Sequence, residues 1–207
     1  MRRRACIQGL SAVITVSIGA APATESAIPP PPAGAGLATV TDHEVLDLVL
    51  GDLLSKASEE SLVSAHGGPP GRLTISSRSA TQPITMENVL YRHEREPWRN
   101  LTEASLPQLR EAAASLVSRV ESGGFSGFQS SDLRVSVREP LDHQAESPEA
   151  LFDRPIEAWP PGYSSDGVLA VVCLSIPWSI HSSTATYVLV KSSRRWTIVV
   201  RQFVYYP

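Results

Sequence analysis

The chain has 207 residues, with 18 basic and 21 acidic side chains, a net charge of −3 and 42% hydrophobic residues. This length fits one domain after processing, and the composition favours a packed core over wholesale disorder. The acidic balance argues against binding to nucleic acid or to an anionic membrane, because both need a basic surface.

Residues 1–23 resemble a secretory signal peptide. A basic start at Arg2–Arg4 precedes a moderately apolar run, and Ala21-Pro22-Ala23 fits a small-x-small cleavage site. Since this leader holds three Arg and no acid, its removal would take the net charge from −3 to −6. A disordered N-terminus or an uncleaved membrane anchor is the alternative, although the run is short for a membrane span. We therefore expect a secreted or periplasmic protein with no stable membrane insertion after leader cleavage.

A Pro/Gly-rich linker is predicted over residues 24–40, followed by a single α+β domain over residues 41–207. The first helix is expected to begin at Thr41, because Thr41 and Glu44 have the spacing of a capping box. Its core-facing stripe consists of apolar residues at helical spacing: Val45, Leu46, Leu48, Val49, Leu50, Leu53 and Leu54.

A second amphipathic helix is predicted from Ser105, with a capping box formed by Ser105 and Gln108, to the helix-stopping pair Gly123-Gly124. Strands are expected at residues 72–76 and 133–138, and a short helix within residues 86–93. The pattern Gly124-Phe-Ser126-Gly127 resembles a nucleophile elbow, but Phe128 stands where that pattern needs Gly, so we interpret it as a loop.

Three strands are predicted in succession over residues 168–206. In the first, Val168, Ala170 and Val172 alternate with Leu169 and Val171, so both faces are apolar. In the third, period two would place Trp196, Ile198, Val200 and Val204 on one face. An edge strand within residues 159–164 is expected to join them. The predicted fold is α+β, with two amphipathic helices packed on a mainly antiparallel sheet that ends in a three- to four-stranded meander.

Few residues have the spacing of a chemical site. None of the five His has a second His or Cys at metal-ligand spacing, and no phosphate-binding or dinucleotide-binding Gly pattern occurs, so we predict neither a metal nor a cofactor. Cys173 lies within an apolar strand, where a small core residue is expected. The weak catalytic candidates are His181 and Ser183 in a turn, with Asp166 to orient the His. A solvated polar turn is the alternative interpretation.

Four apolar residues are candidates for binding. Trp178 and Ile180 follow Pro177 in a connection, where large apolar groups are not expected in water. With Trp159 and Tyr163 they form either a lid over the core or an exposed patch for a partner. Lys191, Arg194, Arg195 and Arg201 form a small basic group near a hairpin, which we interpret as a solvated tip, with anion binding as the alternative.

The segments Gly162 to Val172, Tyr187 to Lys191 and Trp196 to Val199 carry a family likeness. They resemble a layout in exported bacterial proteins that have no assigned activity: an aromatic residue and a turn, then three strands. The last hairpin is also similar to that of NTF2-like and cystatin-like folds, which implies a helix wrapped by a curved sheet.

Two functions follow as hypotheses. The first is a non-catalytic binding or structural module of the cell envelope or extracellular space, with an unknown protein or small ligand as partner. The second is a small secreted hydrolase that uses His181, Ser183 and Asp166. The sparse motifs favour the first.

Overall fold

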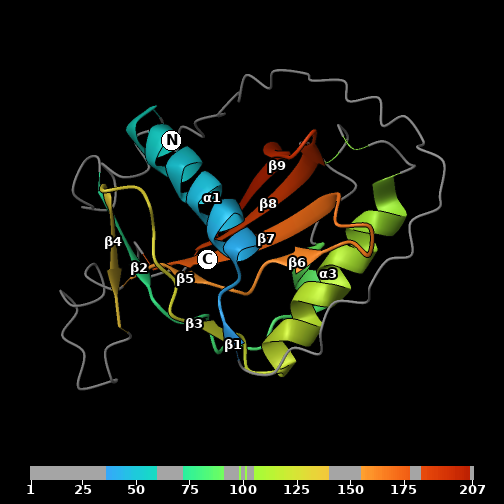
Figure 1. The fold of residues 1–207 in the computed structure, drawn as a ribbon, viewed down its shortest axis with the longest axis horizontal. Helices are drawn as coiled ribbons and strands as arrows, with labels where there is room; N and C mark the ends of the chain where they lie inside the picture. Colours follow the sequence, from blue (N-terminus) through green and yellow to red (C-terminus); the bar gives the residue numbers. More distant parts are fainter. Residues whose placement is uncertain are drawn as a thin grey trace, which may run out of the picture.

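The computed structural model describes residues 36–59, 72–90, 98, 101, 105–139, 155–177 and 183–205. A five-stranded antiparallel sheet forms its centre (Figure 1). Its long strands follow one another in the chain as β7 (Leu169–Ile176), β8 (Ser183–Ser192) and β9 (Arg195–Tyr205). Two short strands, β5 (Glu157–Ala158) and β6 (Gly162–Tyr163), pair with the other edge of β7. The predicted α+β class and its C-terminal meander are confirmed.

Parallel pairs lie outside this sheet. The strand β2 (Leu73–Ser76) pairs parallel with β4 (Val135–Arg138). A parallel bridge between Ile75 and Ile156 places β2 beside the start of β5. The third pair joins β1 (Gly36–Leu37) to β3 (Phe125–Ser126). Thus β1 lies within the stretch that the sequence assigns to a linker.

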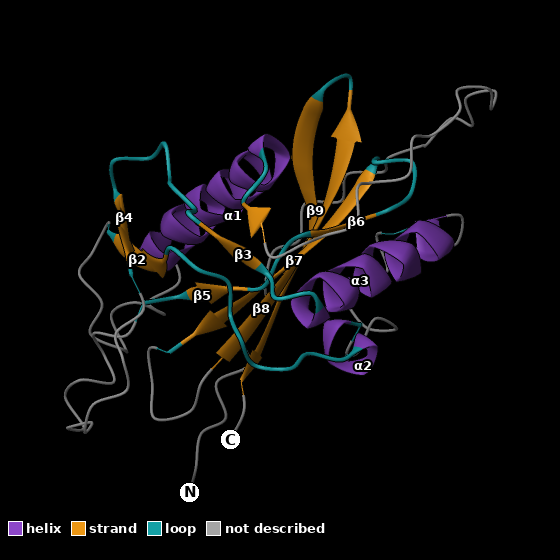
Figure 2. Cartoon of the chain, turned by 60° about the horizontal axis from the view of Figure 1, so that its bottom comes forward, coloured by secondary structure: helices purple, strands orange, loops and turns teal. Residues whose placement is uncertain are grey.

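Two long helices cover opposite faces of the sheet, α1 (Val40–Glu59) and α3 (Leu106–Glu121) (Figure 2). Because side chains alternate along a strand, β7 contributes to both cores. Ala170, Val172 and Leu174 pack in the core on the α1 side. Leu169, Val171 and Cys173 pack in the core on the α3 side. The apolar character of β7 on both faces therefore has a direct structural cause.

The predicted start of the first helix and the predicted capping of the second helix need correction. A reciprocal pair of hydrogen bonds between Thr39 and Asp42 caps α1, two residues before the predicted box at Thr41 and Glu44. Ser105 precedes α3 without a side-chain capping bond. The expected short helix exists as α2 (Met86–Val89), with a capping box between Thr85 and Asn88. None of the described helices combines the length and apolar composition needed to span a membrane.

A β-bulge corrects the predicted faces of β9. The register passes from Val188 opposite Val200 to Leu189 opposite Ile198, so Val199 is the extra residue. An extra residue shifts the alternation by one position. Trp196, Ile198 and Phe203 therefore pack on the α1 side, whereas Val200 packs on the α3 side. The bulge also places Arg201 where it reaches α1.

Candidate functional site

Among the described residues, Asp42 in the first turn of α1 is the one charged residue that is buried. Its side chain has an exposed fraction of 0%. Arg119 donates from Nη1 to Oδ1 and from Nη2 to Oδ2, each at 2.8 Å. The Tyr163 hydroxyl donates to Oδ1 at 2.8 Å, and the Thr39 amide donates to Oδ2 at 2.9 Å. Four donors therefore occupy the positions at which a carboxylate normally accepts hydrogen bonds.

Local structure explains why these residues meet. Asp42 lies near the positive end of the α1 dipole, and Arg119 lies in the last turn of α3, where a cation is favoured. Arg119 also donates from Nη1 to the Pro161 carbonyl oxygen at 2.6 Å, just before β6. Gly162 allows β6 to lie close to α3, since a Cβ at this position would overlap the Ala112 carbonyl oxygen and crowd Leu116 of α3. The site thus joins α1, α3 and β6.

The electrostatics keep Asp42 ionised. Burial alone would raise the pKa of its carboxyl group, but the hydrogen bonds and charge of Arg119 outweigh this effect, so its pKa lies below the ordinary 3.8. For Tyr163, burial and then the Asp42 charge raise the pKa of the hydroxyl far above its usual value. At neutral pH the site therefore contains a carboxylate, a guanidinium and a neutral phenol.

A row of cations and aromatic rings continues the site toward the β8–β9 hairpin. The Arg119 guanidinium lies 5.9 Å from the centre of the Tyr163 ring, which is tilted against the Trp196 ring at a distance of 6.1 Å between ring centres. The ammonium group of Lys191 lies 5.2 Å from the centre of the Trp196 ring. Cations above aromatic rings are attracted by the ring quadrupole. Tyr163 and Trp196 are only partly buried, so this row reaches from the interior to the surface.

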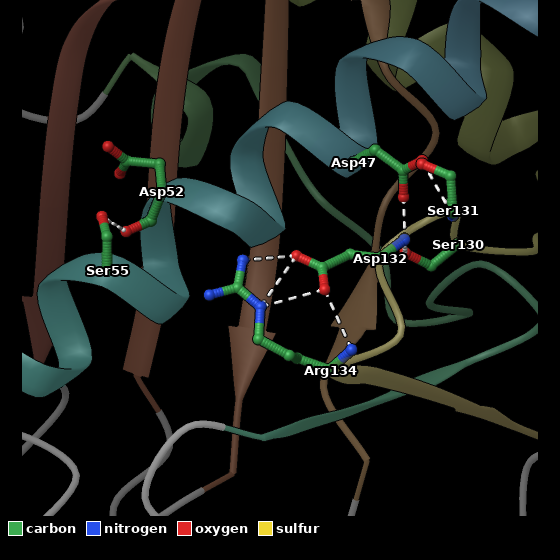
Figure 3. A network of polar contacts seen from close by, with 7 residues as sticks. All are labelled: Asp47, Asp52, Ser55, Ser130, Ser131, Asp132 and Arg134. Atoms are coloured by element: carbon green, nitrogen blue, oxygen red, sulfur yellow. Dashed lines mark hydrogen bonds and ion pairs between the residues drawn. The ribbon is translucent and has the colours of Figure 1, made fainter.

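Two further aspartates fasten α1 to other elements. Asp47 accepts hydrogen bonds from the hydroxyls of Ser130 and Ser131, both at 2.6 Å, and from the Ser131 amide at 3.0 Å (Figure 3). Asp52 is bound by Arg201 of β9, whose Nε donates at 2.6 Å and whose Nη2 donates to the other oxygen. The three aspartates recur every five residues and therefore face different sides of the helix.

Tyr187 lies beside the pair formed by Asp52 and Arg201. Burial, and then the charge of Asp52, raise the pKa of its hydroxyl. Its oxygen is buried and forms no well-aligned hydrogen bond with any described residue, although Asp52 and Arg201 lie close enough to influence its pKa. The two core tyrosines therefore differ, because only the Tyr163 hydroxyl is satisfied.

The predicted catalytic residues are placed as follows. Asp166 lies in the turn before β7, where its Oδ1 accepts bonds from the Ser164 hydroxyl and the Val168 amide. Ser183 begins β8, opposite Ile176 at the far end of β7. Seven strand intervals of about 3.3 Å separate those ends by roughly 23 Å. The structure does not bring Asp166 and Ser183 together, and His181 lies outside the described residues.

Two of the four predicted binding residues lie in the described part of the structure, and they belong to different places in the fold. Trp159 is 5% exposed, and its indole nitrogen donates to the Gln82 carbonyl oxygen at 2.9 Å, so it belongs to the core on the α3 side. Tyr163 belongs to the Asp42 site. Trp178 and Ile180 lie outside the described residues. Cys173 is fully buried as expected, and burial raises the pKa of its thiol to about 12.

Sequence reasoning missed Asp42 and Arg119, although both carried a signal. Asp42 is a charged residue three positions after Thr39, a residue type that favours the N-cap position. Arg119 is a charged residue near the end of the predicted second helix. Their bond spans 77 residues, which no local pattern reveals. The described residues hold no group of three or more potential metal ligands.

Comparison of the chain with protein-family models, with curated proteins and with solved structures gave no match. The likeness to exported bacterial proteins and to NTF2-like or cystatin-like folds therefore stays a prediction. What the structure defines is a class, an α+β fold built on an antiparallel meander.

Proposed function

We propose that the chain is a non-catalytic binding module of the cell envelope or extracellular space, and that it recognises its partner through the outer strand of its sheet. One observation carries this proposal. Within the described residues β9 pairs with β8 alone, and it offers eleven residues of strand at the sheet's edge. An edge strand exposes unpaired N–H and C=O groups, which bind extended segments of other chains.

The parallel pair outside this sheet differs from β9. In the separate β2–β4 pair, β4 has four residues, and the side chains of Arg134 and Arg138 beside and within it are exposed. Short, charged strands are a common protection against edge pairing. In β9 the bulge at Val199 is the comparable device. We therefore expect pairing along the regular segments on either side of that bulge.

The acid–base groups support a non-catalytic role. Asp42 is saturated by donors, the pKa of Cys173 is raised to about 12, and Asp166 is bound within its own turn. A general base or nucleophile needs a free electron pair and a suitable pKa. In our proposal these groups hold the fold together. Export rests on the leader-like residues 1–23, and N-terminal sequencing of the mature protein should then begin at Thr24.

A photo-crosslinking amino acid placed at position 197 tests the proposal in the cell that makes the protein. Thr197 is an exposed residue of β9, and Leu133, fully exposed in the turn before β4, is the matched control. We expect a discrete crosslinked species from position 197 and none from position 133. No adduct at 197, or equal adducts at both sites, would contradict the proposal. Labelling of the folded protein by a serine-directed phosphonate would support the hydrolase instead.

A further inference from the structure

We infer that the partner of β9 is an extended acidic segment of another protein, bound antiparallel to β9 with its carboxylates at the β8–β9 turn. This inference rests on the proposed function. Its first support is the distribution of charge. All 21 acidic residues precede residue 167, whereas residues 167–207 hold four basic residues: Lys191, Arg194, Arg195 and Arg201. The meander is therefore basic in a chain that is acidic overall.

The turn between β8 and β9 concentrates this charge. The hairpin extends beyond both long helices in Figure 2. Ser193 and Arg194 form its turn with φ values of 47° and 77°, a left-handed conformation that non-glycine residues rarely adopt. Arg194 and Arg195 are exposed, and within the described residues neither forms an ion pair. Two guanidinium groups that form no ion pair with a described residue thus lie in the turn and at the first residue of β9.

The positions of the other basic groups indicate in which orientation a segment would bind along β9. Arg201, farther along β9, is neutralised by Asp52. Lys191 lies across the hairpin from the start of β9, opposite Trp196. The available positive charge therefore lies at the turn end of β9 only. Because antiparallel pairing is the more stable arrangement, a bound segment would reach this end with its C-terminal residues, and acidic residues are favoured there.

Other occupants fit less well. A second copy of β9 would bring no carboxylate to Arg194 and Arg195, because residues 167–207 contain no Asp or Glu. Nucleic acid needs many phosphate contacts, whereas this end offers three basic side chains on a chain of net charge −3. An acidic polypeptide satisfies both the backbone groups of the edge and the charge of the turn.

Synthetic peptides test the inference by fluorescence anisotropy with the full chain. The probe has six residues of alternating Thr and Val followed by three Glu, and its control carries the three Glu at the N-terminus. We expect the probe with C-terminal glutamates to bind about tenfold more tightly than the control with N-terminal glutamates. Added salt should reduce this difference in affinity. The double variant Arg194→Ser/Arg195→Ser should lose most of this preference. Arg110→Ser/Arg138→Ser, which removes two exposed arginines elsewhere, should keep it.

A third peptide carries N-methyl groups on alternate residues, which block its hydrogen bonds to the edge. It should not bind. Equal binding of the methylated probe, equal binding of both glutamate orders, or binding of no peptide would overturn the inference. So would a crosslink from position 197 to a second copy of the chain. If position 197 crosslinks to another protein while the charge variants change nothing, the binding module stands and the acidic partner is wrong.

Discussion

The Tyr163 hydroxyl donates a 2.8 Å hydrogen bond to Asp42, a residue 121 positions earlier in the chain. This bond ties the short strand β6 to the first turn of α1. Together with the pair of bonds from Arg119, it fixes where α1 and α3 approach each other at the end of the sheet. The buried polar cluster is therefore a structural joint between elements that are distant in sequence.

The two core tyrosines should respond oppositely to the same substitution. Tyr163→Phe removes a satisfied hydroxyl from a buried carboxylate and should lower the free energy of unfolding by about 1–2 kcal/mol. Tyr187→Phe removes a buried hydroxyl that forms no well-aligned hydrogen bond among the described residues, and should leave stability unchanged or raise it by up to about 1 kcal/mol. Urea denaturation of both variants checks this. A larger loss in Tyr187→Phe would show that its hydroxyl is hydrogen-bonded in solution.

Asp42→Asn should lower the free energy of unfolding by about 3 kcal/mol at neutral pH, because it leaves the Arg119 charge without its partner. The folded-state pKa of Asp42 lies below the ordinary 3.8. Its stabilisation is therefore complete above that value and is lost as the pH falls through the folded-state pKa.

The variant should accordingly show a shallower fall in stability than the wild type as the pH drops below about 4. Thermal unfolding across this range provides the measurement. Asp132→Asn is the control, because its ion pair with Arg134 lies at the surface, and it should change the neutral-pH midpoint little. Parallel curves for Asp42→Asn and the wild type would contradict the assigned role of Asp42.

Two glycines form another matched pair. Gly51 lies in α1, and a Cβ there would meet nothing within 4 Å. Gly51→Ala should therefore raise the free energy of unfolding by about 1 kcal/mol through helix propensity. Gly162→Ala should lower it by several kcal/mol, because the new methyl group overlaps the backbone of α3. A calorimetric midpoint for Gly162→Ala that is unchanged or raised, relative to the wild type, would refute the packing of β6 on α3.

The fold class could be predicted from local sequence patterns, because the burial of strand faces and the ends of helices depend on nearby residues. Alternation in β7 reports burial on two faces, and the Gly123-Gly124 stop corresponds to residues with φ of 96° and 70°. The faces of β9 were not readable, since the bulge at Val199 depends on pairing with β8. The start of α1 was placed two residues late, because the true cap uses Asp42, whose other partners lie far along the chain.

The candidate site was mostly beyond sequence reasoning for the same reason. Tyr163 was selected as an aromatic residue, yet its role comes from Asp42 and Arg119, which belong to different helices. Ser183 and Asp166 are only seventeen positions apart in the numbering, yet the antiparallel register sends them to opposite ends of β7. Sequence proximity across a strand is therefore a poor guide to a catalytic constellation.

The most direct test of a structural, non-catalytic interior is an NMR titration of the Asp42 carboxyl carbon. A carboxylate saturated by Arg119, Tyr163 and Thr39 should titrate below 3.8, or remain ionised until the protein unfolds. A pKa above 3.8 in the folded protein would mean that the carboxylate is not held by these donors, and would contradict the account.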